Sequence, residues 1–88
     1  MVLKYIVIEE RNSPIIFEKV LLHSDVAKSL GNIKSAGFLI LSIHGNKIKI
    51  KCFGESTTLN ISSNPVEDEI LIKDSYFAET STTANYES

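Results

Sequence analysis

Hydrophobic and polar residues alternate over the first part of this chain, and the alternation predicts two strands. Residues 3–9 ("LKYIVIE") are rich in β-branched and aromatic side chains, which favour a strand in the interior of a sheet. The turn-forming sequence "RNSP" follows this segment. We therefore predict a short second strand over residues 15–17, with Pro14 at its edge.

A change of period predicts a short helix in the segment "LLHSDVAKSLG". Ser24 is a favourable N-cap, and Asp25 complements the positive end of the helix dipole. Gly31 supplies the left-handed residue at which such a helix stops. The apolar positions of this helix form one stripe that can pack on a sheet: Val26, Ala27 and Leu30.

The clearest pattern is "FLILSIHGNKIKIKCFG", residues 38–54, in which two alternating runs flank Gly45 and Asn46. These two residues tolerate the backbone of a tight hairpin loop, so His44 should lie opposite Lys47. Every other strand pair follows from this register. One face of the hairpin is then wholly apolar, and we expect it to be buried: Leu39, Leu41, Ile43, Ile48, Ile50 and Cys52.

The other face of the predicted hairpin is mixed, with exposed lysines beside apolar side chains. We treat part of it as the candidate interaction face: Phe38, Ile40, Lys47, Lys49, Lys51 and Phe53. Lysines on alternate positions could follow a phosphate backbone, and the two phenylalanines could stack on bases. The simpler interpretation is a solvated outer face that also discourages pairing between strand edges.

The C-terminal third predicts one more strand and a second helix. "TTLNI" alternates as a third strand of the meander. Ser63 or Asn64 as cap, Pro65 and the acids that follow them indicate a helix start, although a strand through "EILIK" is the alternative. The expected apolar side of this helix excludes Leu71 and consists of Val66, Ile70, Ile72, Tyr76 and Phe77. Its acids, residues 67–69, could pair with the hairpin lysines.

Together these elements predict an α+β fold in the order β-β-α-β-β-β-α, an antiparallel meander with both helices on one face of the sheet. A chain of 88 residues has room for one hydrophobic core. We expect a single domain over residues 1–77 and a disordered tail over residues 78–88, where small polar residues show no periodicity.

Charge is unevenly distributed along the chain. Eight of the nine basic residues precede Gly54, whereas seven of the eleven acidic residues follow it. The net charge of −2 and a single arginine argue against a typical nucleic-acid-binding domain. The longest apolar stretch, "GFLILSI", is far shorter than the roughly 18 residues of a membrane span, and no secretory leader is recognisable. We expect a cytoplasmic protein.

Residues that could support catalysis or bind a metal are sparse. The chain has one cysteine and two histidines, His23 and His44, without the spacing of a zinc site. We interpret both histidines as polar surface residues. The hairpin register directs Cys52 into the core and away from His44, which excludes a Cys–His nucleophile pair.

The pieces "VIEE", "PIIF", "LLHSDVAKSLG", "SAGF", "CFGES" and "LNISSNPVEDE" follow one another between Val7 and Glu69. Their order resembles that of a group of small proteins encoded by tailed bacteriophages and prophages. The resemblance implies a role in the bacterial cytoplasm, during infection or in a resident prophage. It supplies no catalytic residue and no cofactor.

These observations predict a non-catalytic accessory protein, without cofactor or metal, that acts as a protein-interaction module on a host or phage target. Self-association into a dimer would add stability to so small a core. The alternative is a module that binds single-stranded nucleic acid through the lysine-rich face of the 38–53 hairpin.

Overall fold

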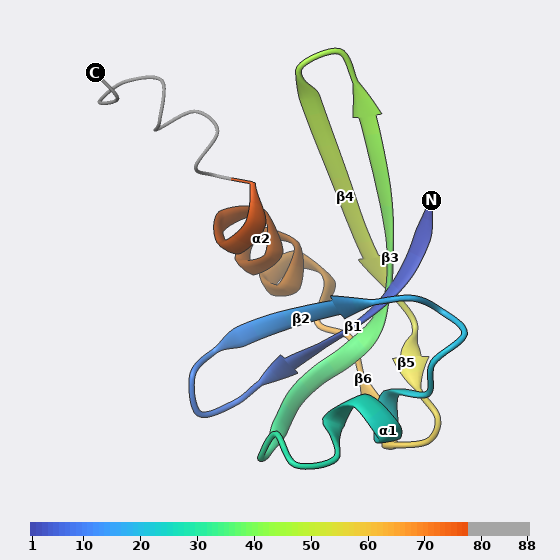
Figure 1. Cartoon of the computed structure of the whole chain (residues 1–88). Helices are drawn as coiled ribbons and strands as arrows, with labels where there is room; N and C mark the ends of the chain where they lie inside the picture. The colour runs from blue at the N-terminus through green and yellow to red at the C-terminus, as the bar shows by residue number, and fades with distance from the viewer. Residues whose placement is uncertain (78–88) are drawn as a thin grey trace.

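The computed structural model describes residues 1–77 (Figure 1), and the tail predicted over residues 78–88 lies outside this part. At its centre is an antiparallel sheet in the order β2-β1-β3-β4. The elements are β1 (Val2–Ile8), β2 (Ser13–Phe17), α1 (His23–Ala27), β3 (Ile33–His44), β4 (Lys47–Phe53), β5 (Glu55–Ser56), β6 (Ile61–Ser62) and α2 (Pro65–Tyr76). The α+β class is confirmed, with one more short strand than predicted.

Strand β1 is buried on both faces, and a different helix covers each face. Tyr5 and Val7 belong to a core cluster that contains Ile72 of α2. Ile6 lies between them in the strand, points to the opposite face and belongs to a cluster that contains Ala27 of α1. The prediction that both helices lie on one face is therefore wrong. The nearly continuous apolar run of β1 needs cover on both sides.

The segment expected as a third meander strand forms a turn instead. Strand β5 pairs with β6 as a separate ladder, in which Glu55 lies opposite Ser62 and Ser56 opposite Ile61. Asn60 has a positive φ of 59°, and its N–H donates to the carbonyl oxygen of Ser56 at 2.8 Å. This left-handed residue folds the chain back after two residues of strand, so alternation alone could not reveal the break.

Helix α1 begins earlier than its capping pattern predicts. Leu22 is the N-cap, and Ser24 lies inside the first turn, where its N–H donates to Thr58 Oγ1 at 3.3 Å. The His23 side chain explains the shift, because it is only 3% exposed and its Nε2 donates to the carbonyl oxygen of Gly37 at 2.9 Å. The expectation of a surface histidine at this position is therefore wrong.

Helix α2 starts as predicted, with Asn64 as N-cap and Pro65 in the first turn. It continues through "EILIK", the segment for which a strand was the alternative. Its inward face is not the predicted one. Asp68 and Ile72 are the buried residues of this helix, and Leu71 also packs against the core. Three residues of the predicted stripe are exposed instead: Val66, Ile70 and Tyr76. Hydrogen bonds to the Asp68 carboxylate hold that side of the helix against the sheet.

The β3–β4 hairpin has the predicted register, from His44 opposite Lys47 at the loop to Phe38 opposite Phe53 at the base. Gly45 supplies the positive φ, 63°, that a two-residue hairpin loop requires at its first position.

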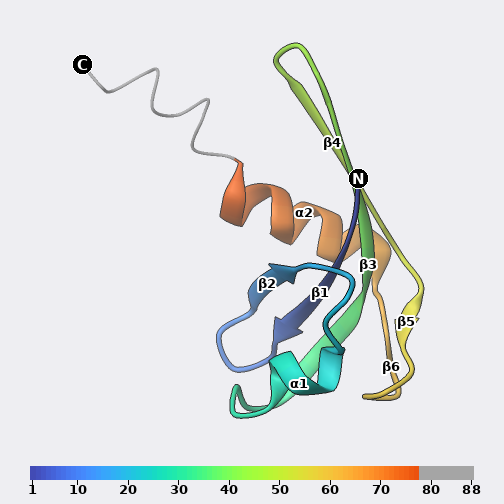
Figure 2. The same ribbon diagram turned by 45° about the vertical axis from the view of Figure 1, so that its right-hand side comes forward.

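Burial along the apolar face of the hairpin declines from base to tip. Leu39 and Cys52 are 1% and 2% exposed, Leu41, Ile48 and Ile50 are half-buried, and Ile43 is 62% exposed. The prediction of a buried face is thus correct at the base and wrong at Ile43. At the N-terminus, Met1 bonds to Leu41 of β3: its carbonyl accepts the Leu41 N–H at 2.9 Å, and its amine donates to the Leu41 carbonyl at 3.3 Å. The hairpin extends beyond this point (Figure 2).

Candidate functional site

The hairpin tip, residues 42–49, is a two-stranded ribbon that projects from the body of the protein. Among the described residues, no third strand pairs with either side of it. Two-stranded ribbons on their own are marginally stable in water, because they bury little apolar surface. Ile43 nevertheless presents an isoleucine side chain to solvent on this ribbon. An apolar residue in such a place can be covered by a partner.

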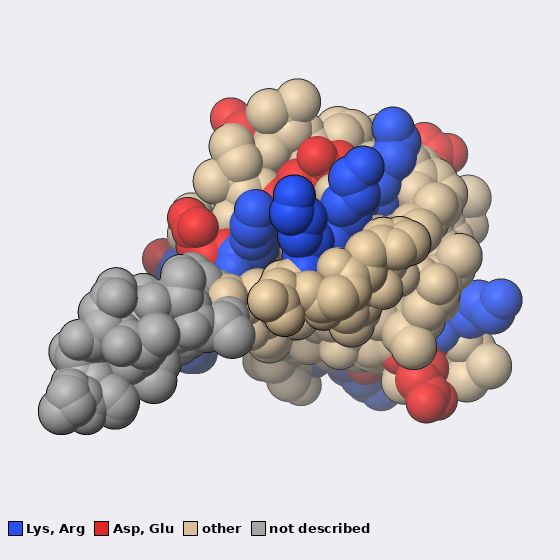
Figure 3. Space-filling view, turned by 90° about the horizontal axis from the view of Figure 1, so that it is seen from above, with Lys and Arg blue, Asp and Glu red and all other residues tan. Residues whose placement is uncertain are grey.

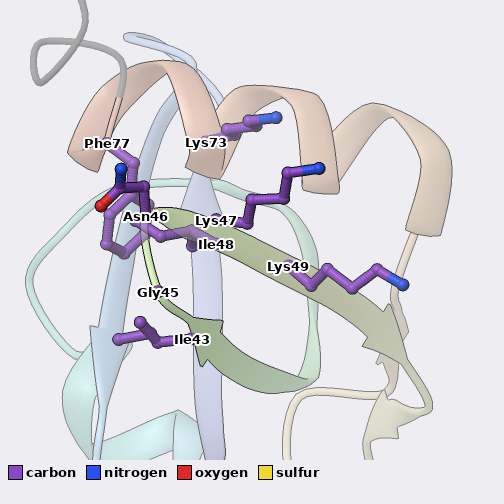
Figure 4. A pocket seen from close by; sticks show the side chains of 8 residues that line it. All are labelled: Ile43, Gly45, Asn46, Lys47, Ile48, Lys49, Lys73 and Phe77. Atoms are coloured by element: carbon purple, nitrogen blue, oxygen red, sulfur yellow. The ribbon is translucent and has the colours of Figure 1, made fainter.

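A groove of about 810 Å³ separates the hairpin tip from the C-terminal half of α2 (Figure 4). Its lining residues are Ile43, Gly45, Asn46, Lys47, Ile48, Lys49, Lys73 and Phe77. Ile43 and Ile48 face each other across the two strands and provide the apolar surface of the hairpin side. Phe77, just beyond the end of α2, provides the apolar surface opposite.

Lysine side chains border this groove. Lys47 and Lys49 come from β4 and Lys73 from α2, and Figure 4 shows all three extending in the same direction. Figure 3, the view from above, shows a row of basic side chains across this face of the molecule, with acidic side chains next to it. The lining residues include no carboxylate, so the groove combines apolar walls with positive charge.

The six residues of the candidate interaction face share the other face of the hairpin, as the register requires. The Phe38 and Phe53 rings stack, with centroids 5.6 Å apart and planes inclined by 24°. Lys4 Nζ lies 5.9 Å from the Phe38 centroid, which is cation–π distance. Ile40 and Phe53 are 36% and 38% exposed, because α2 lies on the opposite face of the sheet.

The acids at the start of α2 bond to groups other than the hairpin lysines. Glu69 Oε2 accepts the main-chain N–H of Cys52 at 2.9 Å, and Glu67 Oε1 accepts the Asn64 side-chain amide at 2.9 Å. Asp68 accepts bonds from Tyr5 and Ser35, as described below. The uneven distribution of charge along the chain is therefore not explained by pairing between α2 and β4.

Asp68 is a buried polar residue whose role was not apparent in the sequence. Its Oδ2 accepts the Tyr5 hydroxyl and the N–H of Asn64, the latter at 2.8 Å, and its Oδ1 accepts the Ser35 hydroxyl at 2.8 Å. Burial, together with the bond to Asp68, raises the pKa of the Tyr5 phenol far above its usual value. The cluster ties β1, β3 and α2 together, and its Tyr5 phenol stays protonated at neutral pH. A buried polar cluster of this kind stabilises a structure.

The Cys52 thiol lies in the core, as the register predicts. Burial raises its pKa to about 12, and the carboxylates of Asp68 and Glu69 contribute to the increase. A protonated thiol that is 2% exposed is a poor nucleophile. Cys52 therefore acts as a small apolar residue at the base of the hairpin.

Within residues 1–77, no group of three or more His, Cys, Asp or Glu side chains could hold a metal ion. In the same part of the chain, neither helix has the length and apolar character needed to cross a lipid bilayer. A scan against protein-family models finds no match, and searches of curated proteins and of solved structures return no similar protein.

Proposed function

We propose that this protein is a non-catalytic interaction module that binds an acidic, partly apolar segment of another protein in the groove beside the hairpin tip. In keeping with the resemblance to small phage and prophage proteins, the partner is a host or phage protein of the bacterial cytoplasm. The proposal rests mainly on one observation: Ile43 is exposed on a projecting ribbon whose groove is bordered by lysines.

The apolar and basic side chains that line the groove favour a partner segment that is both apolar and acidic. Covering an isoleucine side chain contributes about 1.5–3 kcal/mol, which makes Ile43 an effective apolar anchor. Carboxylates on the partner would meet Lys47, Lys49 and Lys73. Such charge pairs steer association and discriminate against basic partners more than they add affinity.

The test uses a fluorescent peptide of alternating glutamate and valine, titrated by anisotropy. Ile43→Ser removes the apolar anchor, and Lys47→Gln combined with Lys73→Gln removes charge from both sides of the groove. We expect each change to weaken binding about tenfold or more, corresponding to 1.4 kcal/mol. Lys28→Gln is the matched control, because Lys28 is an exposed lysine at the end of α1, outside the groove. Equal binding by all of these variants would refute the proposal.

A second candidate function is binding of single-stranded nucleic acid, and the stacked Phe38–Phe53 pair favours it. Phe53 is exposed beside Lys49 and Lys51 on the same face, as in surfaces that combine base stacking with phosphate contacts. Titration with an oligothymidylate at several salt concentrations tests this function. If Lys47, Lys49 and Lys51 contact phosphates, replacing all three with glutamine should reduce the salt slope by about two units.

A further inference from the structure

Strand β4 is an edge strand of the sheet, with β3 as its only neighbour among the described strands. In an antiparallel pair, the main-chain groups of successive residues point alternately toward the partner strand and away from it. Cys52 directs its N–H away from β3, because that N–H donates to Glu69 Oε2 at 2.9 Å. Ile48 and Ile50 have the same parity in the strand, so their N–H and C=O groups also point outward. Within residues 1–77, no group bonds to them.

We propose that β4 receives an extended segment of the partner protein as a fifth, antiparallel strand along Ile48 and Ile50. The inference rests on the proposed function and specifies how the partner is held. Main-chain hydrogen bonds to an exposed sheet edge are a common source of affinity for extended peptides. Antiparallel addition continues the pattern of the sheet, in which every strand pair is antiparallel.

The side chains of β4 determine the sequence of the added strand. Lys47, Lys49 and Lys51 lie on one face, so residues beside them on the added strand should be acidic. Ile48 and Ile50 lie on the other face, and Ile48 lines the groove, so residues beside these should be apolar. The partner segment therefore alternates acidic and apolar residues, with the apolar ones directed into the groove.

Glu69 sets one end of the available edge. Its carboxylate accepts a hydrogen bond from the outward N–H of Cys52, so an added strand cannot bond to this N–H without displacing the carboxylate. The chain then turns at Gly54, which has a positive φ of 76°. At the other end lies the loop at Gly45 and Asn46. The open part of the edge is thus a short stretch of β4 beside the groove, which limits how long a strand can add.

A second copy of this chain does not fit the edge. If two β4 strands paired antiparallel with like faces together, lysine would oppose lysine, and like charges placed directly opposite destabilise a strand pair. If the two β4 strands were shifted by one residue relative to each other, isoleucine would lie beside lysine, and the grooves of the two copies would lie on opposite faces of the joined sheet. Both registers are unfavourable, so the segment belongs to a different, acidic protein.

Backbone methylation of the glutamate–valine peptide, about six residues long, tests the proposal. In antiparallel addition, the valines lie opposite Ile48 and Ile50 and their N–H groups donate to β4, whereas the glutamate N–H groups point away. N-methylation of the valines should abolish binding, and N-methylation of the glutamates should leave it within about twofold. Equal binding by the two methylated peptides would overturn strand addition.

Ile48→Pro provides the matching change in the protein. Proline removes an N–H that points away from β3, a position at which edge strands tolerate it. We expect peptide binding to weaken about tenfold or more, with Ile48→Val, which keeps the N–H, as control. Lys49→Glu should reverse the charge preference, so that a peptide of alternating lysine and valine binds more tightly than the glutamate–valine peptide. Thermal melting of each variant verifies the fold.

The outcomes separate the two proposals. If binding depends on Ile43 and Lys73 but tolerates Ile48→Pro and valine methylation, the groove function stands and strand addition is overturned. If no acidic peptide binds, both are refuted. If the protein itself forms a dimer in sedimentation that Ile48→Pro dissociates, the edge belongs to a second copy and the inference is wrong.

Discussion

The base and the tip of the β3–β4 hairpin have the same alternation and one continuous register, yet opposite environments. At the base, Leu39 and Cys52 are buried beneath α2, whereas at the tip Ile43 is 62% exposed on the same face. The difference is due to neighbours, because β1 ends before the tip and α2, which packs on the base, is separated from the tip by the groove. Identical local patterns can therefore give a core in one place and a binding surface a few residues further on.

The largest expected effect comes from the base. Leu39→Ala should lower the free energy of unfolding by about 2–5 kcal/mol, because it leaves a cavity among Tyr5, Cys52 and Ile72 that these residues cannot fill. Urea denaturation monitored by circular dichroism measures the loss. A decrease below about 1 kcal/mol would show that the base is packed as loosely as the tip.

The polar cluster beneath the base should follow in magnitude. Asp68→Asn replaces a carboxylate oxygen with an amide that cannot accept both the Tyr5 and Ser35 hydroxyls, so we expect a loss of about 1–3 kcal/mol. Asp74→Asn, an exposed acid on the same helix, should change the unfolding free energy little. Similar urea midpoints for the two variants would contradict the assigned role of Asp68.

Glu69 marks the boundary between the closed and open parts of the β4 edge. Glu69→Ala leaves the partly exposed N–H of Cys52 without its acceptor and should cost about 1 kcal/mol. It also lengthens the open edge, so light scattering should detect more self-association than in the wild type. Glu69→Gln retains an acceptor oxygen and should behave like the wild type. Comparable scattering from all three proteins would show that Glu69 does not protect the edge.

The two histidines repeat the comparison between base and tip. Burial lowers the pKa of His23, which contacts the base of the hairpin through Phe38 and Gly37. Between the pKa of His23 in the folded chain and its higher pKa in the unfolded chain, the unfolded chain binds a proton at this histidine that the folded chain does not. The contribution of this histidine is fully present above its unfolded pKa of about 6.5 and declines as the pH falls below that value. His23→Gln should flatten this dependence in urea titrations, whereas His44→Gln at the exposed tip should leave it intact.

The smallest effect is expected at the tip itself. Ile43→Ala should change the unfolding free energy by no more than about 0.5 kcal/mol, because the side chain is already largely in water. The same variant should bind the glutamate–valine peptide more weakly. A stability loss similar to that of Leu39→Ala would mean that the tip is part of the core, which would remove the main support for the proposed groove.

Much of the fold was predictable from local patterns, and most of the errors share a cause. The turn at Gly45 defined the hairpin pairs, and Pro65 defined the start of α2. Several other expectations were wrong, among them the burial of Ile43, the inward face of α2, the surface position of His23 and the placement of both helices on one face. Each depends on which element packs on which, and periodicity contains no information about that.

The sequence by itself determined the order of most elements, the hairpin register, the exposed lysines of β4 and the core position of Cys52. These follow from steric preferences of single residues and from the two-residue period of a strand, which act over short stretches of chain. Only the tertiary structure decided that the helices cover opposite faces, that Asp68 is buried, and that the tip projects past β1. These features depend on contacts between residues distant in the sequence, such as the hydrogen bond between Tyr5 and Asp68, which are 63 positions apart. Packing and buried hydrogen bonds select such contacts, so the groove emerges only when the elements assemble.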